Sequence, residues 1–148
     1  MSSDTINAHM NFSTTCFNDA WELLDRANRS EDDNQRMIHL AHASLYHWLQ
    51  RPDVTDQNIA IGYWLLARVY ATLRQPVPAF INAEQALRYS ENLPAFYQAY
   101  AHEALARAAA ISGDRQRLKA HMNLAKEYLL QLDESDRNQL LDDLATIR

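Results

Sequence analysis

The sequence has little glycine, proline or cysteine: its 148 residues include 2 Gly, 4 Pro and 1 Cys. So few turn-forming residues exclude a loop-rich fold, a β-sandwich with many tight turns and a glycine-rich loop that cradles phosphate. The single cysteine, Cys16, permits neither an internal disulfide nor a cysteine-based zinc cluster. These absences point to a chain with few turns and no metal or disulfide framework.

The chain also lacks an excess of basic residues and any long hydrophobic run. Its formal net charge is −5, which is the wrong sign for a non-specific nucleic-acid binder. No apolar stretch approaches the roughly 20 residues that span a membrane, and residues 1–11 show no basic region followed by an apolar stretch, as a signal peptide would. We therefore expect a cytoplasmic protein with no nucleic-acid partner and no membrane partner.

Helix-forming residues dominate what is present. Ala and Leu total 41 residues, whereas the β-branched Val, Ile and Thr total 16. Ala and Leu favour helices, and β-branched residues favour strands. The length suits one domain with a real core. The composition therefore predicts an all-α fold in a single domain over residues 1–148.

Proline, glycine and serine mark the expected helix boundaries. Proline breaks a helix interior but is tolerated in the first turn, glycine ends a helix in the left-handed conformation, and serine caps the start. Pro52, Pro76, Pro94, Gly113 and Ser30 therefore mark helix boundaries, and the polar residues 1–12 are expected to form an N-terminal arm. The predicted helices cover residues 14–29, 31–50, 55–74, 77–91, 94–112, 115–131 and 135–147.

The sequence contains an internal repeat. Segments 21–27, 63–69 and 102–108 align without gaps at offsets of 42 and 39 residues, and each carries Leu, one further residue and Arg at the same positions. The same offsets align a second stripe at spacing i, i+4, i+7, and all nine of its members are small or apolar, as on one helix face. These nine residues are Met37, Ala41, Ser44, Ala79, Ala83, Ala86, Leu118, Met122 and Ala125.

The repeat resembles the tetratricopeptide repeat (TPR), whose first helix carries a bulky residue, Leu, a small residue and an aromatic, and whose second helix carries a small-residue stripe. The middle repeat fits best, with Tyr63, Leu66, Ala67 and Tyr70 on its first helix, while the first repeat has Asp25 at the small position. The chain is also similar to uncharacterised bacterial TPR-like proteins. The resemblance implies a right-handed α-α superhelix of three helix pairs, over residues 13–51, 55–91 and 94–131, followed by a capping helix at 135–147.

The expected capping helix has one apolar stripe and one polar face. Its apolar residues are Leu140, Leu141, Leu144 and Ile147, which are suited to pack on the preceding repeat. We expect its other face to be the polar end of the array. That outer face carries Asp136, Arg137, Asp142 and Asp143.

In a TPR-like stack the first helices of each pair line a concave groove, and the resemblance implies binding of a protein or peptide there. Arg26, Arg68 and Arg107 would then form a ladder with aromatic residues between them. Guanidinium groups bind carboxylates and stack on aromatic rings, so an acidic peptide or a free C-terminal carboxylate would suit the groove. The candidate partner-binding residues are Glu22, Arg26, Trp64, Arg68, Tyr100, Glu103 and Arg107.

A second interpretation of the same residues is structural. Glu22 with Arg26 and Glu103 with Arg107 are i, i+4 pairs that would neutralise each other on their own helices. Arg68 has Trp64 four residues earlier instead of Glu, so it is the arginine expected to be free for a ligand. Trp64 is equally suited to filling the core.

Histidines raise the alternative of a metal site or an enzyme. His39 and His42 are three residues apart with His47 farther along, a spacing that can place imidazoles on one ion, but no carboxylate at i+3 or i+4 completes a site. No nucleophile and base stand at a supporting spacing. We expect a protein-interaction scaffold with no catalytic residue, metal or cofactor. The alternatives are a homo-oligomeric structural subunit that uses the same surface, and a small-ligand or metal-binding enzyme.

Overall fold

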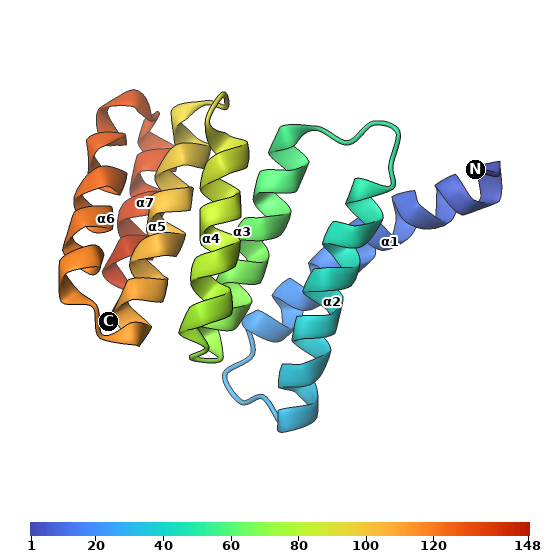
Figure 1. The fold of residues 1–148 in the computed structure, drawn as a ribbon, viewed down its shortest axis with the longest axis horizontal. Coiled ribbons are helices and arrows are strands. Elements are labelled where there is room, and N and C mark those ends of the chain that lie inside the picture. Colours follow the sequence, from blue (N-terminus) through green and yellow to red (C-terminus); the bar gives the residue numbers. More distant parts are fainter.

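The computed structural model describes residues 1–148 and contains seven α-helices, one short 3₁₀-helix and no strand (Figure 1). The all-α fold predicted from composition is confirmed. None of the helices is both long enough and apolar enough to cross a membrane. The elements are α1 (Ser3–Leu24), α2 (Glu31–Leu49), α3 (Asp56–Thr72), α4 (Pro76–Ser90), α5 (Ala95–Ser112), α6 (Arg115–Glu127), η1 (Leu129–Gln131) and α7 (Glu134–Ala145).

The helices form three hairpins in a row, α1 with α2, α3 with α4 and α5 with α6, and α7 folds back onto α5 (Figure 1). The second and third hairpins pack closely, because α5 contacts both α3 and α4. The first hairpin is inclined to the others, and α1 touches α3 at few positions. The row of hairpins is therefore tightly packed at one junction and more open at the other.

Local capping explains where most helices begin and end. The Ser30 side chain accepts a hydrogen bond from the Asp33 backbone N–H, and the Asp33 side chain accepts one from the Ser30 N–H, which completes a capping box. Pro76 is the first residue of α4, and Gly113 ends α5 in the left-handed conformation. These three signals are confirmed. The last helix is capped by Asp133.

The first helix departs most from the sequence prediction. The expected helix start at residue 14 is wrong, because Ser2 caps a helix that begins at Ser3 and includes most of the residues expected to form an arm. The Ser13 carbonyl accepts a hydrogen bond from the Ser44 hydroxyl at 2.7 Å, which ties the middle of this helix to α2. The helix also ends early, at Leu24, since the Arg29 guanidinium occupies carbonyls that a longer helix would use, including that of Leu24 at 3.2 Å.

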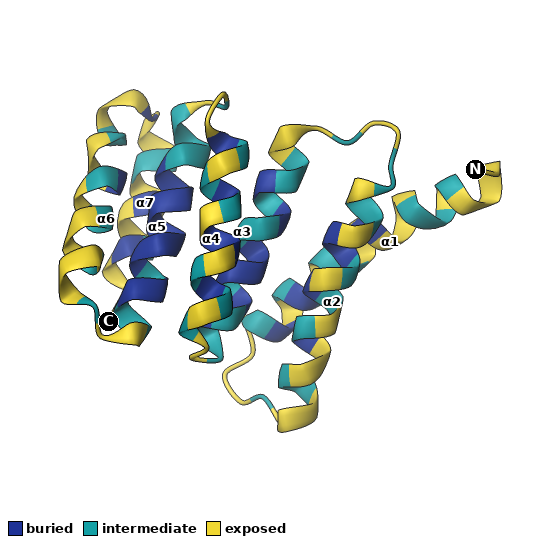
Figure 2. Ribbon diagram, in the orientation of Figure 1, coloured by how far each residue is buried: buried dark blue, intermediate teal, exposed yellow.

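The buried residues lie on the facing sides of the helices (Figure 2), and most of the predicted small-residue stripe belongs to this core. Seven of its nine members are buried, and the two half-buried ones, Leu118 and Met122, lie on α6 at the end of the hairpin row. At the α2–α3 contact, a Cβ placed on Gly62 would lie 2.7 Å from Cδ1 of Leu45. The absence of a side chain at Gly62 therefore lets these two helices approach closely.

Candidate functional site

Glu103 on α5 is the centre of a polar network inside the protein. Its side chain is 0% exposed, so its charge requires partners from the surrounding helices. Trp64 Nε1 donates a hydrogen bond to Glu103 Oε2 at 3.1 Å, Arg68 Nη2 donates to Oε1 at 3.4 Å, and Arg107 Nε donates to the same oxygen. One buried carboxylate thus holds two cations, from α3 and from its own helix.

Helix α7 completes this network from the opposite side. Tyr100 donates its hydroxyl proton to Asp143 Oδ2 at 2.6 Å, and Arg68 Nη2 lies 3.5 Å from Asp143 Oδ1. Arg107 Nη2 donates to the Asp143 carbonyl at 2.9 Å and to the Thr146 hydroxyl. Burial and the hydrogen bond to Asp143 raise the pKa of Tyr100 above its ordinary range, so this hydroxyl stays protonated as a donor.

Two sequence interpretations of these residues are wrong. Arg68 is not the unpaired arginine that was expected, because its Nη2 pairs with both Glu103 and Asp143. Asp143 is not on the polar outer face of the last helix, because it points inward to Tyr100 and Arg68, while Leu141 of the expected apolar stripe is 40% exposed. The expected pairing of Glu103 with Arg107 is confirmed.

The first repeat does not contribute to this network. Glu22 is exposed and makes no hydrogen bond or ion pair. Arg26 lies beyond the end of α1 and its Nη1 is 3.7 Å from Asp33 Oδ1, so the expected Glu22–Arg26 pair is wrong. The proposed ladder of three equivalent arginines is wrong for the same reason, since α1 ends before it can present Arg26 on the groove face.

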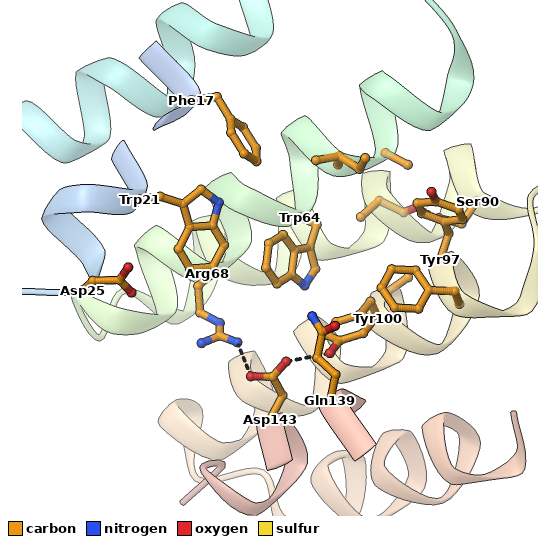
Figure 3. Close-up of a pocket in the computed structure, with 15 residues that line it drawn as sticks. Phe17, Trp21, Asp25, Trp64, Arg68, Ser90, Tyr97, Tyr100, Gln139 and Asp143 are labelled. Atoms are coloured by element: carbon orange, nitrogen blue, oxygen red, sulfur yellow. Dashed lines mark hydrogen bonds and ion pairs between the residues drawn. The ribbon is translucent and has the colours of Figure 1, made fainter. Parts of the chain in front are cut away.

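An aromatic pocket of about 540 Å³ lies where α1, α3, α5 and α7 meet (Figure 3). Ten of its 15 lining residues are hydrophobic, and it is partly open to solvent. The polar side chains in its lining are those of Asp25, Arg68, Ser90, Gln139 and Asp143. Six aromatic residues form most of its wall: Phe17, Trp21, Trp64, Phe96, Tyr97 and Tyr100.

These rings form a continuous series from α1 to α5. The Trp21 and Trp64 ring centroids are 5.5 Å apart, Trp64 meets Tyr100 edge-on at 5.8 Å, and Tyr100 lies 4.8 Å from Phe96. Such contacts fix ring positions and leave little side-chain freedom to lose on binding. Figure 3 shows the Arg68–Asp143 pair at one edge of this wall. The arrangement is suited to burying a large apolar or aromatic group.

Sequence reasoning identified Trp64, Arg68 and Tyr100 as site residues and missed the other aromatic residues of the pocket. The repeat pattern could have identified Trp21, because this residue occupies the bulky position of the first repeat segment. Phe17, Phe96 and Tyr97 lie outside the aligned segments, so the repeat pattern contained no information about them. They reach the pocket because α1 and α5 converge on the same face of α3.

The histidines expected to lie near one another form separate pairs. His42 Nε2 lies 2.8 Å from the Tyr70 hydroxyl, and His47 Nδ1 lies 2.7 Å from His9 Nδ1, while His39 is exposed. Burial is the main cause that lowers the pKa of both His42 and His47. No group of three or more His, Cys, Asp or Glu side chains is placed to hold a metal ion.

Comparisons with protein-family models, with curated proteins and with solved structures return no match for this chain. The TPR resemblance therefore stays a prediction from the sequence. Function has to be inferred from the contacts, the shape and the charges of the site itself.

Proposed function

We propose that this chain is a TPR-like interaction module that binds a segment of a partner protein by taking a large apolar side chain into the aromatic pocket. The observation that supports this most is the half-open, 540 Å³ pocket with six aromatic residues in its wall. Pockets of this size and composition are typical of binding sites, and Trp, Tyr and Arg are the residues that most often dominate binding energy. A right-handed superhelical arrangement of the hairpins is part of the same proposal.

The charges around the pocket favour an apolar anchor over an acidic one. Arg68 is the only cationic residue in the lining, and Glu103 and Asp143 already neutralise it. Asp25 and Asp143 also belong to the lining, so an acidic group placed there would meet two carboxylates. The bound segment is therefore expected to insert a Trp, Phe or Leu side chain and to continue along the open side of the pocket.

Peptides selected from a displayed random library against the intact protein would test this proposal. Tryptophan fluorescence can report binding, because Trp21 and Trp64 line the pocket, whereas Trp48 lies elsewhere, under the Arg51 guanidinium at 3.8 Å. We expect the selected peptides to share a large apolar residue and to change this fluorescence in a saturable way.

A pair of tyrosine variants provides the matched control. Tyr97 lines the pocket and its hydroxyl makes no hydrogen bond in the chain, so Tyr97→Ala should weaken peptide binding by about tenfold or more with little change in thermal stability. Tyr46 is 57% exposed on α2 and does not line the pocket, so Tyr46→Ala should bind like the wild type. Equal peptide affinity in both variants, or selected peptides without a common apolar residue, would overturn the proposal.

A further inference from the structure

A second pocket, of about 250 Å³, borders the polar network at Arg68 and Arg107 and lies between the C-terminal ends of α3, α5 and α7. Its lining includes the arginines Arg68, Arg74, Arg107 and Arg148 and no Asp or Glu side chain. The whole chain has only 14 Lys and Arg residues and a net charge of −5, so four arginines around one small pocket are a marked local concentration of positive charge. We call this site the basic pocket.

Much of the hydrogen-bonding capacity of these arginines is unused. The Arg74 side chain makes no hydrogen bond or ion pair. The Nη1 groups of Arg68 and Arg107 make none either, since only Nη2 of Arg68 and Nε and Nη2 of Arg107 are engaged. Arg68 Nε is the one buried side-chain nitrogen or oxygen in the chain without a hydrogen-bond partner. The network with Glu103 and Asp143 therefore does not satisfy the guanidinium groups that border the basic pocket.

The backbone at Arg74 is a second observation that points to this pocket. Arg74 has φ 58°, in the left-handed region that residues with a Cβ rarely adopt, and it is the only residue other than glycine with a positive φ. Gly113 lies 39 residues later, at the repeat offset, and ends α5 with φ 77°. The chain thus has arginine, at a cost in free energy, at the helix end where the next repeat has glycine. The turn with the arginine is the one that borders the basic pocket.

We infer that the basic pocket is a binding site for a phosphate group, held by Arg68, Arg74 and Arg107. These three guanidinium groups come from α3, from the turn after it and from α5, so they reach the pocket from separate positions. A phosphate has oxygens on several sides and up to two negative charges, and it can accept from all three, whereas one guanidinium already satisfies both oxygens of a carboxylate. The hydroxyl of Thr72, which makes no hydrogen bond, is a further donor in the lining.

Charge favours an anion in the basic pocket, although it does not in the aromatic pocket. Glu103 and Asp143 offset the charges of Arg68 and Arg107, while Arg74 has no acidic partner and adds uncompensated positive charge at the rim. The phosphate could be free in solution or part of an ester. The inference is independent of the aromatic pocket, although Arg68 lines both sites.

Calorimetric titration of the full chain with inorganic phosphate, and with acetate at matched ionic strength, tests the inference. We expect saturable phosphate binding at millimolar concentrations and acetate binding at least about tenfold weaker. Phosphoserine with blocked termini is the third titrant. Tighter binding of this ester than of inorganic phosphate would assign the site to phosphorylated ligands, and equal or weaker binding would assign it to the free ion. Absence of phosphate binding, or equal binding of acetate, would overturn the inference.

Arg74→Gly separates a ligand role from a structural one. The substitution removes the guanidinium and relieves the left-handed strain, so phosphate affinity should fall about tenfold or more while the melting temperature stays the same or rises. Arg115→Gly is the matched control, because Arg115 is exposed, follows the equivalent turn of the next repeat and lines neither pocket. Wild-type phosphate affinity in Arg74→Gly would contradict the inference. Tyr97→Ala should leave phosphate binding unchanged, so the proposals for the two pockets can be overturned independently.

Discussion

The surface formed by α1, α3 and α5 has two halves: a closed half between α3 and α5, and an open half between α1 and α3. Both follow the same repeat pattern, but different side chains occupy them. Between α3 and α5, Ala67 and Ala106 are buried, the helices pack closely, and the polar network occupies the remaining space. Between α1 and α3 the equivalent small position is Asp25, which is exposed and caps the end of α1. A charged residue cannot take the place of alanine in a close helix contact, so this half stays open and forms one side of the aromatic pocket, which α5 and α7 complete.

One position on the first helix of each repeat shows how strongly the neighbouring helices determine the environment of a residue. Glu22, Trp64 and Glu103 are equivalent by the repeat offsets, yet Glu22 is exposed, Trp64 lines the pocket and Glu103 is fully buried. The same residue type at the first and third positions meets opposite environments, because only Glu103 has α3 on one side and arginines that reach it. The comparison shows that a repeat pattern determines which face a residue occupies but not its partners.

The largest effect of a substitution on stability is expected at Glu103, at the centre of the closed half. Glu103→Ala should lower the free energy of unfolding by about 3–5 kcal/mol, because it leaves the mostly buried Arg68 and Arg107 without their shared carboxylate. The equivalent change Glu22→Ala should cost less than about 0.5 kcal/mol, since Glu22 has no partner. Urea denaturation of both variants measures this difference, and equal losses would show that the two halves do not differ as described.

A smaller effect is expected where α7 closes the network. Asp143→Asn keeps an acceptor for Tyr100 but removes the charge beside Arg68, and we expect a loss of about 1.5 kcal/mol. Asp142→Asn is the control, because Asp142 is the exposed neighbour without a partner. Hydrogen exchange should show α7 opening more often in the first variant only. Unchanged exchange in α7 would mean that its apolar contacts alone hold it in place.

The smallest effect is a pH dependence that both halves share. Burial is the main cause that lowers the pKa of His42 in the open half and of His102 and His121 in the closed half. The unfolded chain therefore binds more protons near pH 6.5, so the free energy of unfolding should fall as the pH drops below about 6.5 and level off below the folded-state pKa values. His102→Gln should flatten this dependence in urea denaturation between about pH 7 and pH 5. A slope as steep as that of the wild type would contradict the assignment to His102.

Helix positions could be predicted well because their causes are local. Ser30, Pro76 and Gly113 act within a turn or two of their own backbone, and the small-residue stripe depends only on helical periodicity. The first helix was predicted less well for the opposite reason. Its extension over residues 3–12 depends on contacts with α2 such as that of His9 with His47, whereas its early end has a local cause, the Arg29 guanidinium five residues beyond Leu24.

The amino-acid sequence by itself determined an all-helical chain, most helix ends and the buried stripe, since composition, periodicity and capping are properties of neighbouring residues. Tertiary structure decided which charges are paired and where the surface stays open. Arg68 meets Asp143 across 75 residues, and no pattern along the chain predicts that contact. A pocket is the space that several helices leave between them, so the aromatic and basic pockets exist only once α1, α3, α5 and α7 have packed.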